Sequence, residues 1–265
     1  MSGFSADWLS LREPVDQRSR SGVILGAIER YFQKSDRVSA IDLASGRGSM
    51  IRALTSRLPK RQVWYAIDDE PVLLRDAELT RTGTIQIQSR LVNLVENLED
   101  VLSTAADLVV TSAFIDLVSD RWLNQLVHGT MARSLPVYLG MSYDGRVMCS
   151  PRHDLDDVVI AAFARHQRRD KGFGPALGPE AGDVAADKFG EAGYEVTVER
   201  ADWHLTVEER DLQSMMVAGW YAAVTELNEL EPHALNAWHE QRLAWIADGR
   251  STMTVGHLDI WTVPR

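Results

Sequence analysis

The sequence predicts an α/β fold built on a doubly wound, mainly parallel sheet. The first observation is the order of segments in Val38–Leu54, where a buried strand is followed by a glycine turn and an apolar-spaced helix. The second is that Gln62–Ile67 forms another buried strand, which ends at acidic residues. The third is that strand and helix patterns alternate along the rest of the chain, as expected for such a sheet.

The remaining elements follow from apolar periodicity and from turn residues. A helix with apolar residues from Val23 to Tyr31 precedes the first strand, and Gly193 gives a C-terminal stop to a later helix. Further strands are predicted at Thr84–Gln88, Ala106–Phe114, Leu135–Ser142, Tyr194–Val198 and Thr252–Val263. Further helices are predicted at 122–131, 180–192, roughly 207–230 and 232–248.

The glycine turn after the first strand indicates a site for a small polar molecule at a sheet edge. A dinucleotide fingerprint needs a third glycine, but Ile51 stands at that position. A phosphate-binding loop needs a lysine followed by serine or threonine, and the chain has Ser49–Met50 there. Both patterns therefore fail, and an ordinary strand-to-helix turn stays open as the simplest alternative.

The second strand supplies an acid where a ligand's ribose would lie. Asp68 follows the glycine turn by about 20 residues, and a carboxylate accepts hydrogen bonds from two adjacent hydroxyls at once. The alternative is that Asp68 and its neighbours cap the helix that Pro71 opens. Both roles are compatible, with Asp69 or Glu70 acting as the cap.

The glycine turn after the first strand resembles the glycine loop of the class I S-adenosylmethionine-dependent methyltransferases, whose pattern is acid-x-Gly-x-Gly-x-Gly. Here it stands as Asp42–Gly48, with Ala44 in place of the first glycine and a bulky Arg47 where a small residue is usual. The motifs of the resemblance cover Ile41–Ser119, and strand order covers the rest. The resemblance implies a Rossmann-like sheet of about seven strands with a C-terminal antiparallel strand. It implies S-adenosylmethionine as cofactor, with S-adenosylhomocysteine as product, bound by Asp42, Ala44, Ser45, Gly46, Gly48, Asp68, Asp69 and Ser112.

Two more contacts with S-adenosylmethionine, the methyl donor, follow from the resemblance. Asn93 stands where such enzymes carry an Asp or Asn beside the adenine amine, although a plain turn residue is an equal alternative. The segment before the first strand would act as a lid, in which Arg12 could bind the methionine carboxylate. Pairing of Arg12 with a neighbouring acid, Glu13 or Asp16, is the favoured alternative.

Residues 143–180 are the least core-like and are predicted to select the substrate. Asp144 and Arg146 stand at the expected tip of the fifth strand, and Arg168 and Arg169 belong to a basic cluster before a Gly-Phe-Gly segment. We expect all four residues to bind the substrate, with Arg168 and Arg169 of the basic cluster holding an anionic group on it. The simpler interpretation of the cluster is a solvated helix end.

Methyl transfer from a sulfonium needs alignment, exclusion of water and, in some reactions, a base. His166 is the first base candidate because its ordinary pKa lies near neutrality. Asp116 follows the fourth strand, where the family's transferred methyl would lie, although an acid that begins the next helix is an equal interpretation. Tyr143 is a further catalytic candidate, and no metal ligand set is recognised.

Composition sets the remaining bounds. The net charge of −10 offers no basic footprint, so nucleic acid is not expected as a partner. The single cysteine, Cys149, excludes an internal disulfide and a cysteine zinc cluster, which suits the cytoplasm. No apolar run approaches 18 residues, so no membrane insertion is expected. Aromatic residues of the last third are interpreted as packing first, with a homodimer contact or a substrate wall second.

We therefore interpret the chain as a single methyltransferase domain, residues 1–265. Its parts are an N-terminal helical lid (1–36), a donor-binding half (37–142), a substrate insertion (143–180) and a C-terminal half with a helical pair (181–265). Its predicted function is S-adenosylmethionine-dependent methyl transfer to a small anionic metabolite by in-line displacement. Two alternatives stay open: a non-catalytic scaffold, suggested by Ala44 and Arg47, and an NAD(P)-dependent oxidoreductase, opposed by the missing third glycine.

Overall fold

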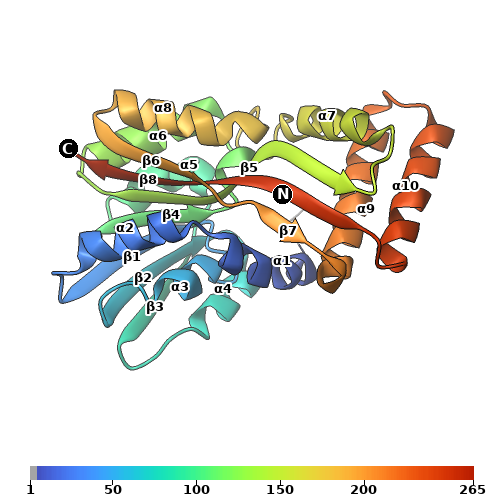
Figure 1. The fold of residues 1–265 in the computed structure, drawn as a ribbon. Coiled ribbons are helices and arrows are strands. Elements are labelled where there is room, and N and C mark those ends of the chain that lie inside the picture. The colour runs from blue at the N-terminus through green and yellow to red at the C-terminus, as the bar shows by residue number, and fades with distance from the viewer. Residues whose placement is uncertain (1–4) are drawn as a thin grey trace.

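The computed structural model describes residues 5–265, and one mixed β-sheet forms its centre (Figure 1). The strand order is β3-β2-β1-β4-β5-β8-β6, and the short β7 pairs with β8 beside this path. Strands β1 to β5 pair in parallel, whereas β8 runs antiparallel to both β5 and β6. The predicted fold class, with its antiparallel C-terminal strand, is therefore confirmed.

The elements have the following bounds. The strands are β1 Arg37–Leu43, β2 Arg61–Asp68, β3 Ile85–Leu91, β4 Leu108–Ser112, β5 Val137–Ser150, β6 Tyr194–Arg200, β7 Trp203–Leu205 and β8 Thr252–Pro264. The α-helices are α1 Ala6–Ser19, α2 Gly22–Phe32, α3 Ser49–Leu54, α4 Pro71–Glu78, α5 Leu94–Leu102, α6 Asp120–Met131, α7 Asp156–Gln167, α8 Ala181–Glu191, α9 Arg210–Leu227 and α10 Pro232–Ala247. Short 3₁₀ turns lie at Ile115–Leu117, Gly178–Glu180 and Val207–Glu209.

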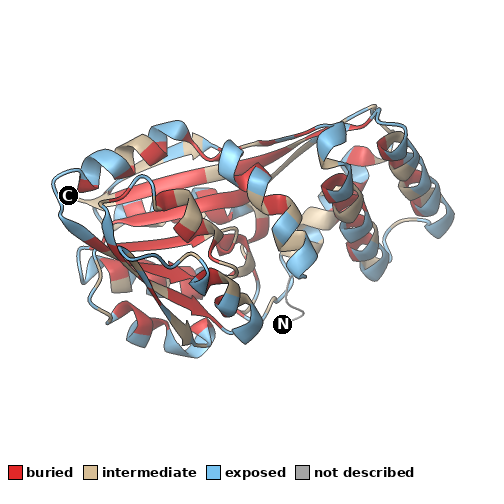
Figure 2. Cartoon of the chain, turned by 90° about the horizontal axis from the view of Figure 1, so that it is seen from below, coloured by how far each residue is buried: buried red, intermediate tan, exposed pale blue. Residues whose placement is uncertain are grey.

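Helices cover both faces of the sheet, as a doubly wound fold requires. Apolar residues of α2, α3 and α4 pack on one face around Trp64 and Val110, and those of α5, α6 and α8 pack on the other around Ile41 and Val109. Each fully buried aliphatic or aromatic side chain contributes about 1.5–3 kcal/mol. Figure 2 shows buried residues on the strands and exposed residues on the outer sides of the helices.

The parallel strands end level with one another. Leu43 at the end of β1 pairs in register with Ile67 of β2 and Thr111 of β4, and Asp68 pairs with Leu91 of β3. The loops that follow these four strands therefore emerge at the same edge of the sheet, which is where open α/β folds bind ligands.

Strands β5 and β8 extend past the main sheet and carry three helices, α7, α9 and α10, which we call the helical cap (Figure 1). The cap has its own apolar cluster, which includes Trp203, Trp220 and Trp238, all at most 3% exposed. The packing interpretation of these aromatic residues is confirmed. The cap combines α7 from the predicted insertion with α9 and α10 from the predicted C-terminal half.

The main departure from the predicted elements is the length of β5, which was expected to end at Ser142. It continues to Ser150 because β8 pairs with the extension, Val147 lying opposite Val255 and Ser150 opposite Thr252. Bulges on either side of Tyr143 interrupt the pairing. Strand β7 was not predicted, and α9 is shorter than the expected helix. Within residues 5–265, no helix combines the length and apolarity needed to cross a membrane.

Candidate functional site

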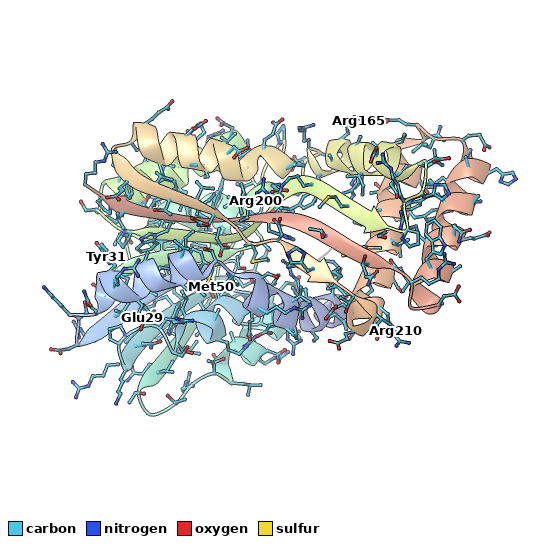
Figure 3. The ribbon with its side chains drawn as sticks, in the orientation of Figure 1. Glu29, Tyr31, Met50, Arg165, Arg200 and Arg210 are labelled. Carbon is cyan, nitrogen blue, oxygen red and sulfur yellow. The ribbon has the colours of Figure 1, made fainter. Side chains whose placement is uncertain are left out.

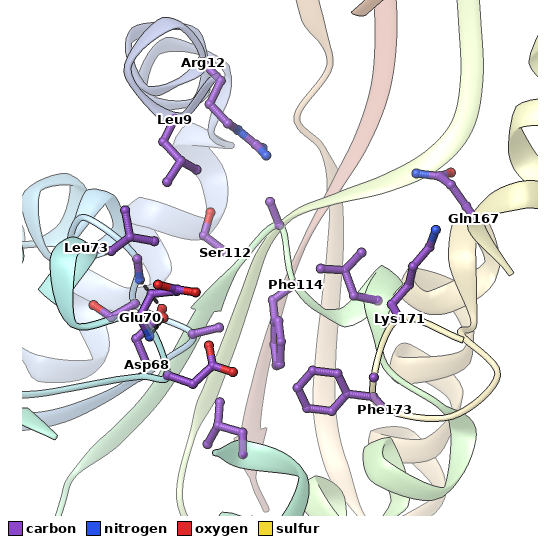
Figure 4. Close-up of a pocket in the computed structure, with 18 of the residues that line it drawn as sticks. Leu9, Arg12, Asp68, Glu70, Leu73, Ser112, Phe114, Gln167, Lys171 and Phe173 are labelled. Atoms are coloured by element: carbon purple, nitrogen blue, oxygen red, sulfur yellow. Dashed lines mark hydrogen bonds between the residues drawn. The ribbon is translucent and has the colours of Figure 1, made fainter. Parts of the chain in front are cut away.

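A cleft of about 1010 Å³ opens at the carboxyl edge of the parallel strands (Figure 4). The loops after β1, β2, β3 and β4 form its floor, and α1 lies along one side. The end of α7, the loop 168–174 and one face of α9 form the opposite side. The cleft therefore has a half on the sheet edge and a half under the helical cap.

The glycine bend shapes the sheet-edge half. Gly46 and Gly48 both adopt a left-handed backbone, with φ of 53° and 78°. A Cβ atom at Gly48 would lie 3.0 Å from Ala77, so a side chain there would push α4 away. A Cβ at Gly46 would meet no atom within 4 Å, although Gly46 lines the cleft. The bend thus leaves open space directly above Gly46.

Ala44 adopts the same left-handed region, with φ of 51°, so it replaces a glycine at some backbone strain. Asp42 lies beneath the bend, and its carboxylate accepts a hydrogen bond of 2.6 Å from the Ser45 hydroxyl. Burial raises the pKa of Asp42 to about 7. Ala44, Ser45 and Gly46 line the cleft, whereas Asp42 and Gly48 do not. Asp42 therefore supports the bend from below.

Asp68 joins the end of β2 to the bend. Its carboxylate accepts hydrogen bonds from the Gly46 amide at 2.7 Å and from the Glu70 amide at 3.0 Å. Burial raises its pKa, while both amides stabilise the ionised form. Asp68 also lines the cleft, as does the more exposed Asp69. The carboxylate thus fixes the loop and still borders the open space.

Helix α1 is fixed over the bend by charged contacts. Arg52 donates to both carboxylate oxygens of Glu13 at 2.5 and 2.7 Å, and Arg47 donates to Ser10. Arg12 forms a two-point ion pair with Asp16, which also accepts from the indole of Trp203. The favoured pairing of Arg12 is therefore confirmed, although its side chain is buried at the cleft and does not lie on the surface.

Ser112 ends β4 at the cleft and belongs to a buried network. Arg20 donates to the Ser112 hydroxyl at 2.9 Å and to the Tyr138 hydroxyl at 3.2 Å. Tyr138 in turn donates to Asp259 at 2.9 Å. Arg20 is only 5% exposed and holds the orientation of Ser112. No local pattern in the sequence indicates this role, because the partners lie far apart along the chain.

Asn93 does not line the cleft. Its side-chain oxygen accepts from the Val95 amide at 2.8 Å and caps α5, so it acts as the turn residue of the alternative interpretation. The neighbouring residues Val92 and Leu94 line the cleft in its place. The side-chain oxygen of Asn93 caps the helix because it satisfies a backbone N–H group that has no partner within the helix.

The cap half contains the basic cluster, and its charges are mostly paired. His166 and Arg169 both contact Glu226, at 2.9 and 3.3 Å. Arg168 pairs with Glu180 at 2.7 Å and lies outside the cleft lining. The cluster is therefore neutralised by acids of α9 and of the 3₁₀ turn before α8, which corrects the expectation that Arg168 faces the ligand.

Asp144 and Arg146 also lie outside the cleft. They pair with one another, and Arg146 pairs with Asp202 at 2.7 Å. Both sit within β5, because the strand continues past its predicted tip. The expectation that these two residues bind substrate fails for this structure. Tyr143 is likewise outside the lining, and burial raises the pKa of its hydroxyl above the usual value, so it stays protonated at neutral pH.

Asp116 lies on the 3₁₀ turn after β4 and is 8% exposed. Its Oδ1 atom has no hydrogen-bond partner within residues 5–265. Burial raises the pKa of Asp116 to about 6, and the positive charges of Arg12 and Lys171 oppose this shift. Asp116 does not line the cleft, although Phe114 and Leu117 on either side of it in the sequence do. Asp116 and Asp42 are the two acids of the site whose pKa values are raised close to neutrality, the range that suits proton exchange.

No protein-family model and no curated protein sequence matches this chain. Solved structures do match. A cyclopropane-fatty-acyl-phospholipid synthase-like protein from Lactobacillus casei gives a TM-score of 0.58 at 14% identity, over 98% of this chain and 94% of that one. The YcgJ protein from Bacillus subtilis gives 0.53 at 10% identity, over 92% and 100%. A cyclopropane synthase from Mycobacterium tuberculosis gives 0.51 at 10% identity, over 97% and 94%.

These likenesses agree with the strand order, in which the antiparallel β8 lies between β5 and β6. The chain has the fold of the class I S-adenosylmethionine-dependent methyltransferases. In this methyltransferase fold the cleft lies at the expected edge. It brings together most of the predicted donor contacts, namely Arg12, Ala44, Ser45, Gly46, Asp68, Asp69 and Ser112. Of the predicted substrate and catalytic residues, only His166 and Arg169 line it.

The cap half of the methyltransferase fold contains residues that the sequence analysis did not select. Gln167 and Lys171 reach into the cleft, as Figure 4 shows, and Phe114 and Phe173 form an apolar wall with ring centroids 5.3 Å apart. Within residues 5–265 no three or more His, Cys, Asp or Glu side chains are grouped so that they could hold a metal ion.

The raised pKa of Asp116 predicts a pH dependence of stability. The folded state holds the proton up to about pH 6, whereas the unfolded chain releases it near pH 4. Stability from this group is therefore present at low pH and lost as the pH rises through about 6. Relative to Asp116→Asn, which cannot ionise, the parent should lose stability between about pH 4 and about pH 6.5 in urea titrations and change little above that. An Asp120→Asn variant, changed at a mostly exposed acid, should keep the parent's pH profile; an unchanged profile for Asp116→Asn would contradict the assignment.

Proposed function

We propose that this protein transfers a methyl group from S-adenosylmethionine to a small molecule held under the helical cap. The observation that supports it most is the geometry of the sheet-edge half, where the Gly46 bend and the Asp68 carboxylate border one open space. A cleft of about 1010 Å³ is at the upper end of the usual range for a single small ligand, so it has room for a donor and an acceptor together.

The residues present fit the donor. The open space above Gly46 admits a ligand where a larger side chain would intrude. The Asp68 carboxylate retains acceptor capacity for ribose hydroxyls beside its two amide contacts. Val92 and Leu94 offer an apolar surface next to it. S-adenosylmethionine, when bound, supplies an activated methyl group on a sulfonium.

The chain's own contribution to the reaction is binding, exclusion of water and control of a proton. The acceptor atom forms a bond to the methyl carbon as the sulfur–carbon bond breaks, and the acceptor's proton must leave. We propose Asp116 as the group that receives this proton, because it lies between Phe114 and Leu117, which line the cleft, and its Oδ1 atom has no hydrogen-bond partner within residues 5–265. His166 is the second candidate, but its ring already bonds Glu226. Tyr143 is assigned no base role, because its pKa is raised.

We propose that the acceptor is a small anionic metabolite. The cap covers the site, which limits size, and the lining includes Arg169 and Lys171. The cytoplasmic location, the absence of nucleic acid as a partner and pairing into a homodimer stay predictions from the sequence. The proposed function is tested by incubating the protein with S-adenosylmethionine and a low-molecular-weight cell extract. Release of S-adenosylhomocysteine above the extract-free rate is expected; a rate equal to that control would favour the scaffold alternative.

We also propose α1 as a lid over the donor. Replacing Glu13 by Ala removes its two-point contact with Arg52, which joins α1 to α3. Since partly exposed ion pairs contribute up to about 1 kcal/mol, S-adenosylhomocysteine should dissociate roughly three- to fivefold faster. Stopped-flow measurements of dissociation test this. Glu29→Ala, which removes an exposed pair with Arg57 away from the cleft, is the control, and equal rates for both variants would show that α1 does not retain the ligand.

A further inference from the structure

The cap half of the cleft contains few polar side chains without a partner. Helix α9 presents Gly219, Ala222 and Ala223 to it, which offer no side-chain hydrogen bond, and Glu226, which is paired with His166 and Arg169. Because the glycine and the two alanines are small, they leave width between α9 and the loop 168–174. Recognition of a polar substrate must therefore come from the end of α7 and from this loop.

The charged residues of that loop are mostly used within the protein. His166 and Arg169 both bond Glu226. Asp170 accepts from the amides of Gly172 at 2.7 Å and Gly174 at 3.0 Å, which fixes the loop's own turn. His166, Arg169 and Asp170 therefore already have partners within the protein. These three side chains are poor candidates for selecting a substrate.

Gln167 and Lys171 differ from these neighbours. Lys171 lines the cleft and takes part in no ion pair or side-chain hydrogen bond within residues 5–265. The Oε1 atom of Gln167 is buried and also has no partner in that range. Figure 4 shows both side chains on the cap side of the cleft, Lys171 above Phe173 and Gln167 farther from that ring. A buried polar atom without a partner costs about 1–3 kcal/mol, so such atoms call for a ligand.

The surroundings of Lys171 define the charge of that ligand. Removal from water lowers the pKa of Lys171, and the acids Glu226 and Asp116 only partly offset this loss. A cationic substrate would be repelled here, and a neutral one would leave the ammonium without a counter-charge. An anionic oxygen would supply the charge-assisted hydrogen bond that Lys171 lacks.

We propose that Lys171 and Gln167 form the recognition pair for the methyl acceptor. Lys171 binds an anionic oxygen, of a carboxylate or a phosphate, and Gln167 accepts a hydrogen bond from an O–H or N–H group of the same molecule. The acceptor class is thus a small hydroxylated or aminated anion, with an apolar part that packs on Phe114 and Phe173. This inference rests on the proposed methyl transfer and replaces Arg168 by Lys171 as the anion-binding residue.

The experiment uses the intact protein, tritium-labelled S-adenosylmethionine and the fraction below about 3 kDa of an extract from the organism that encodes the chain. The labelled product is expected to bind an anion exchanger at pH 7. Alkaline phosphatase will abolish that binding for a phosphate monoester and leave it unchanged for a carboxylate. A labelled product that passes through the exchanger would overturn the inference.

Variants test the residues. Lys171→Met and Gln167→Leu should each lower kcat/KM for the acceptor, measured by formation of the labelled product, by about 10- to 100-fold, the size of a lost charge-assisted or buried hydrogen bond. Their affinity for S-adenosylhomocysteine should stay at the parental value. Arg165→Ala, changed on the outside of the cap at an exposed pair with Glu229, is the control (Figure 3). Parental kcat/KM for Lys171→Met would overturn the inference, whereas a parent that yields no labelled product at all would overturn the methyl transfer itself.

Discussion

Replacing Asp156 by Ala should lower the free energy of unfolding by about 3–5 kcal/mol. Asp156 is 7% exposed and begins α7, and its carboxylate forms an ion pair with Arg242 of α10, which is 0% exposed. The same carboxylate accepts from the Trp238 indole at 2.9 Å. Removing it leaves a buried guanidinium and a buried indole N–H without their acceptor. Urea unfolding monitored by circular dichroism measures the loss.

The neighbouring residue gives a matched control. Asp157 also lies in the first turn of α7 and pairs with Arg152, but both side chains are about three-quarters exposed, at 76% and 74%. Asp157→Ala should therefore change stability by less than about 1 kcal/mol. Equal losses for the two variants would show that the acids act through the helix N-terminus and not through the buried pair. A double variant, Asp156→Leu with Arg242→Met, should recover part of the stability, because it removes the unpaired charge.

Replacing Asp68 by Ala should weaken binding of S-adenosylhomocysteine by about 100-fold, the loss expected when about 3 kcal/mol of charge-assisted hydrogen bonding disappears. The variant loses the contact that the carboxylate would make with the ribose. It also loses the anchor of the Gly46 amide, so the bend is no longer held in place. Isothermal titration calorimetry gives the affinity, and a thermal unfolding scan establishes that the variant is folded.

Asp69→Ala is the comparison for this prediction. Asp69 lines the same cleft one residue later, but it is exposed and is no donor or acceptor in the contacts of the bend. Its replacement should weaken binding less than about tenfold, since exposed charges contribute little. If Asp69→Ala bound S-adenosylhomocysteine more weakly than Asp68→Ala, Asp69 would make the ribose contact. Asp68 would then only hold the loop in place.

Local patterns predicted the donor half well. Gly46 and Asp68 stand at the ends of strands that their own apolar residues define, so a short stretch of sequence suffices to place them at one sheet edge. Asn93 is different, because a helix cap and a ligand contact use the same residue type, and only the structure shows its bond to Val95.

The cap half depends on contacts between distant segments. Strand β5 continues beyond Ser142 only because β8, more than a hundred residues later, pairs with it. The basic cluster is neutralised by Glu226 of α9, which no local pattern connects with Arg169. Lys171 becomes a candidate for substrate binding because, unlike Arg169, it has no ion-pair partner within residues 5–265. Such roles follow from tertiary packing and cannot be obtained from spacing along the chain.

The most direct test of the account is a calorimetric titration of the purified protein with S-adenosylhomocysteine. The account predicts binding of one molecule per chain, with a dissociation constant in the micromolar range or tighter, corresponding to about −8 kcal/mol or more favourable. NADH, titrated under the same conditions, should give no heat of binding. Absence of binding at concentrations up to about 1 mM S-adenosylhomocysteine would contradict the claim that the Gly46 bend and Asp68 form a donor site.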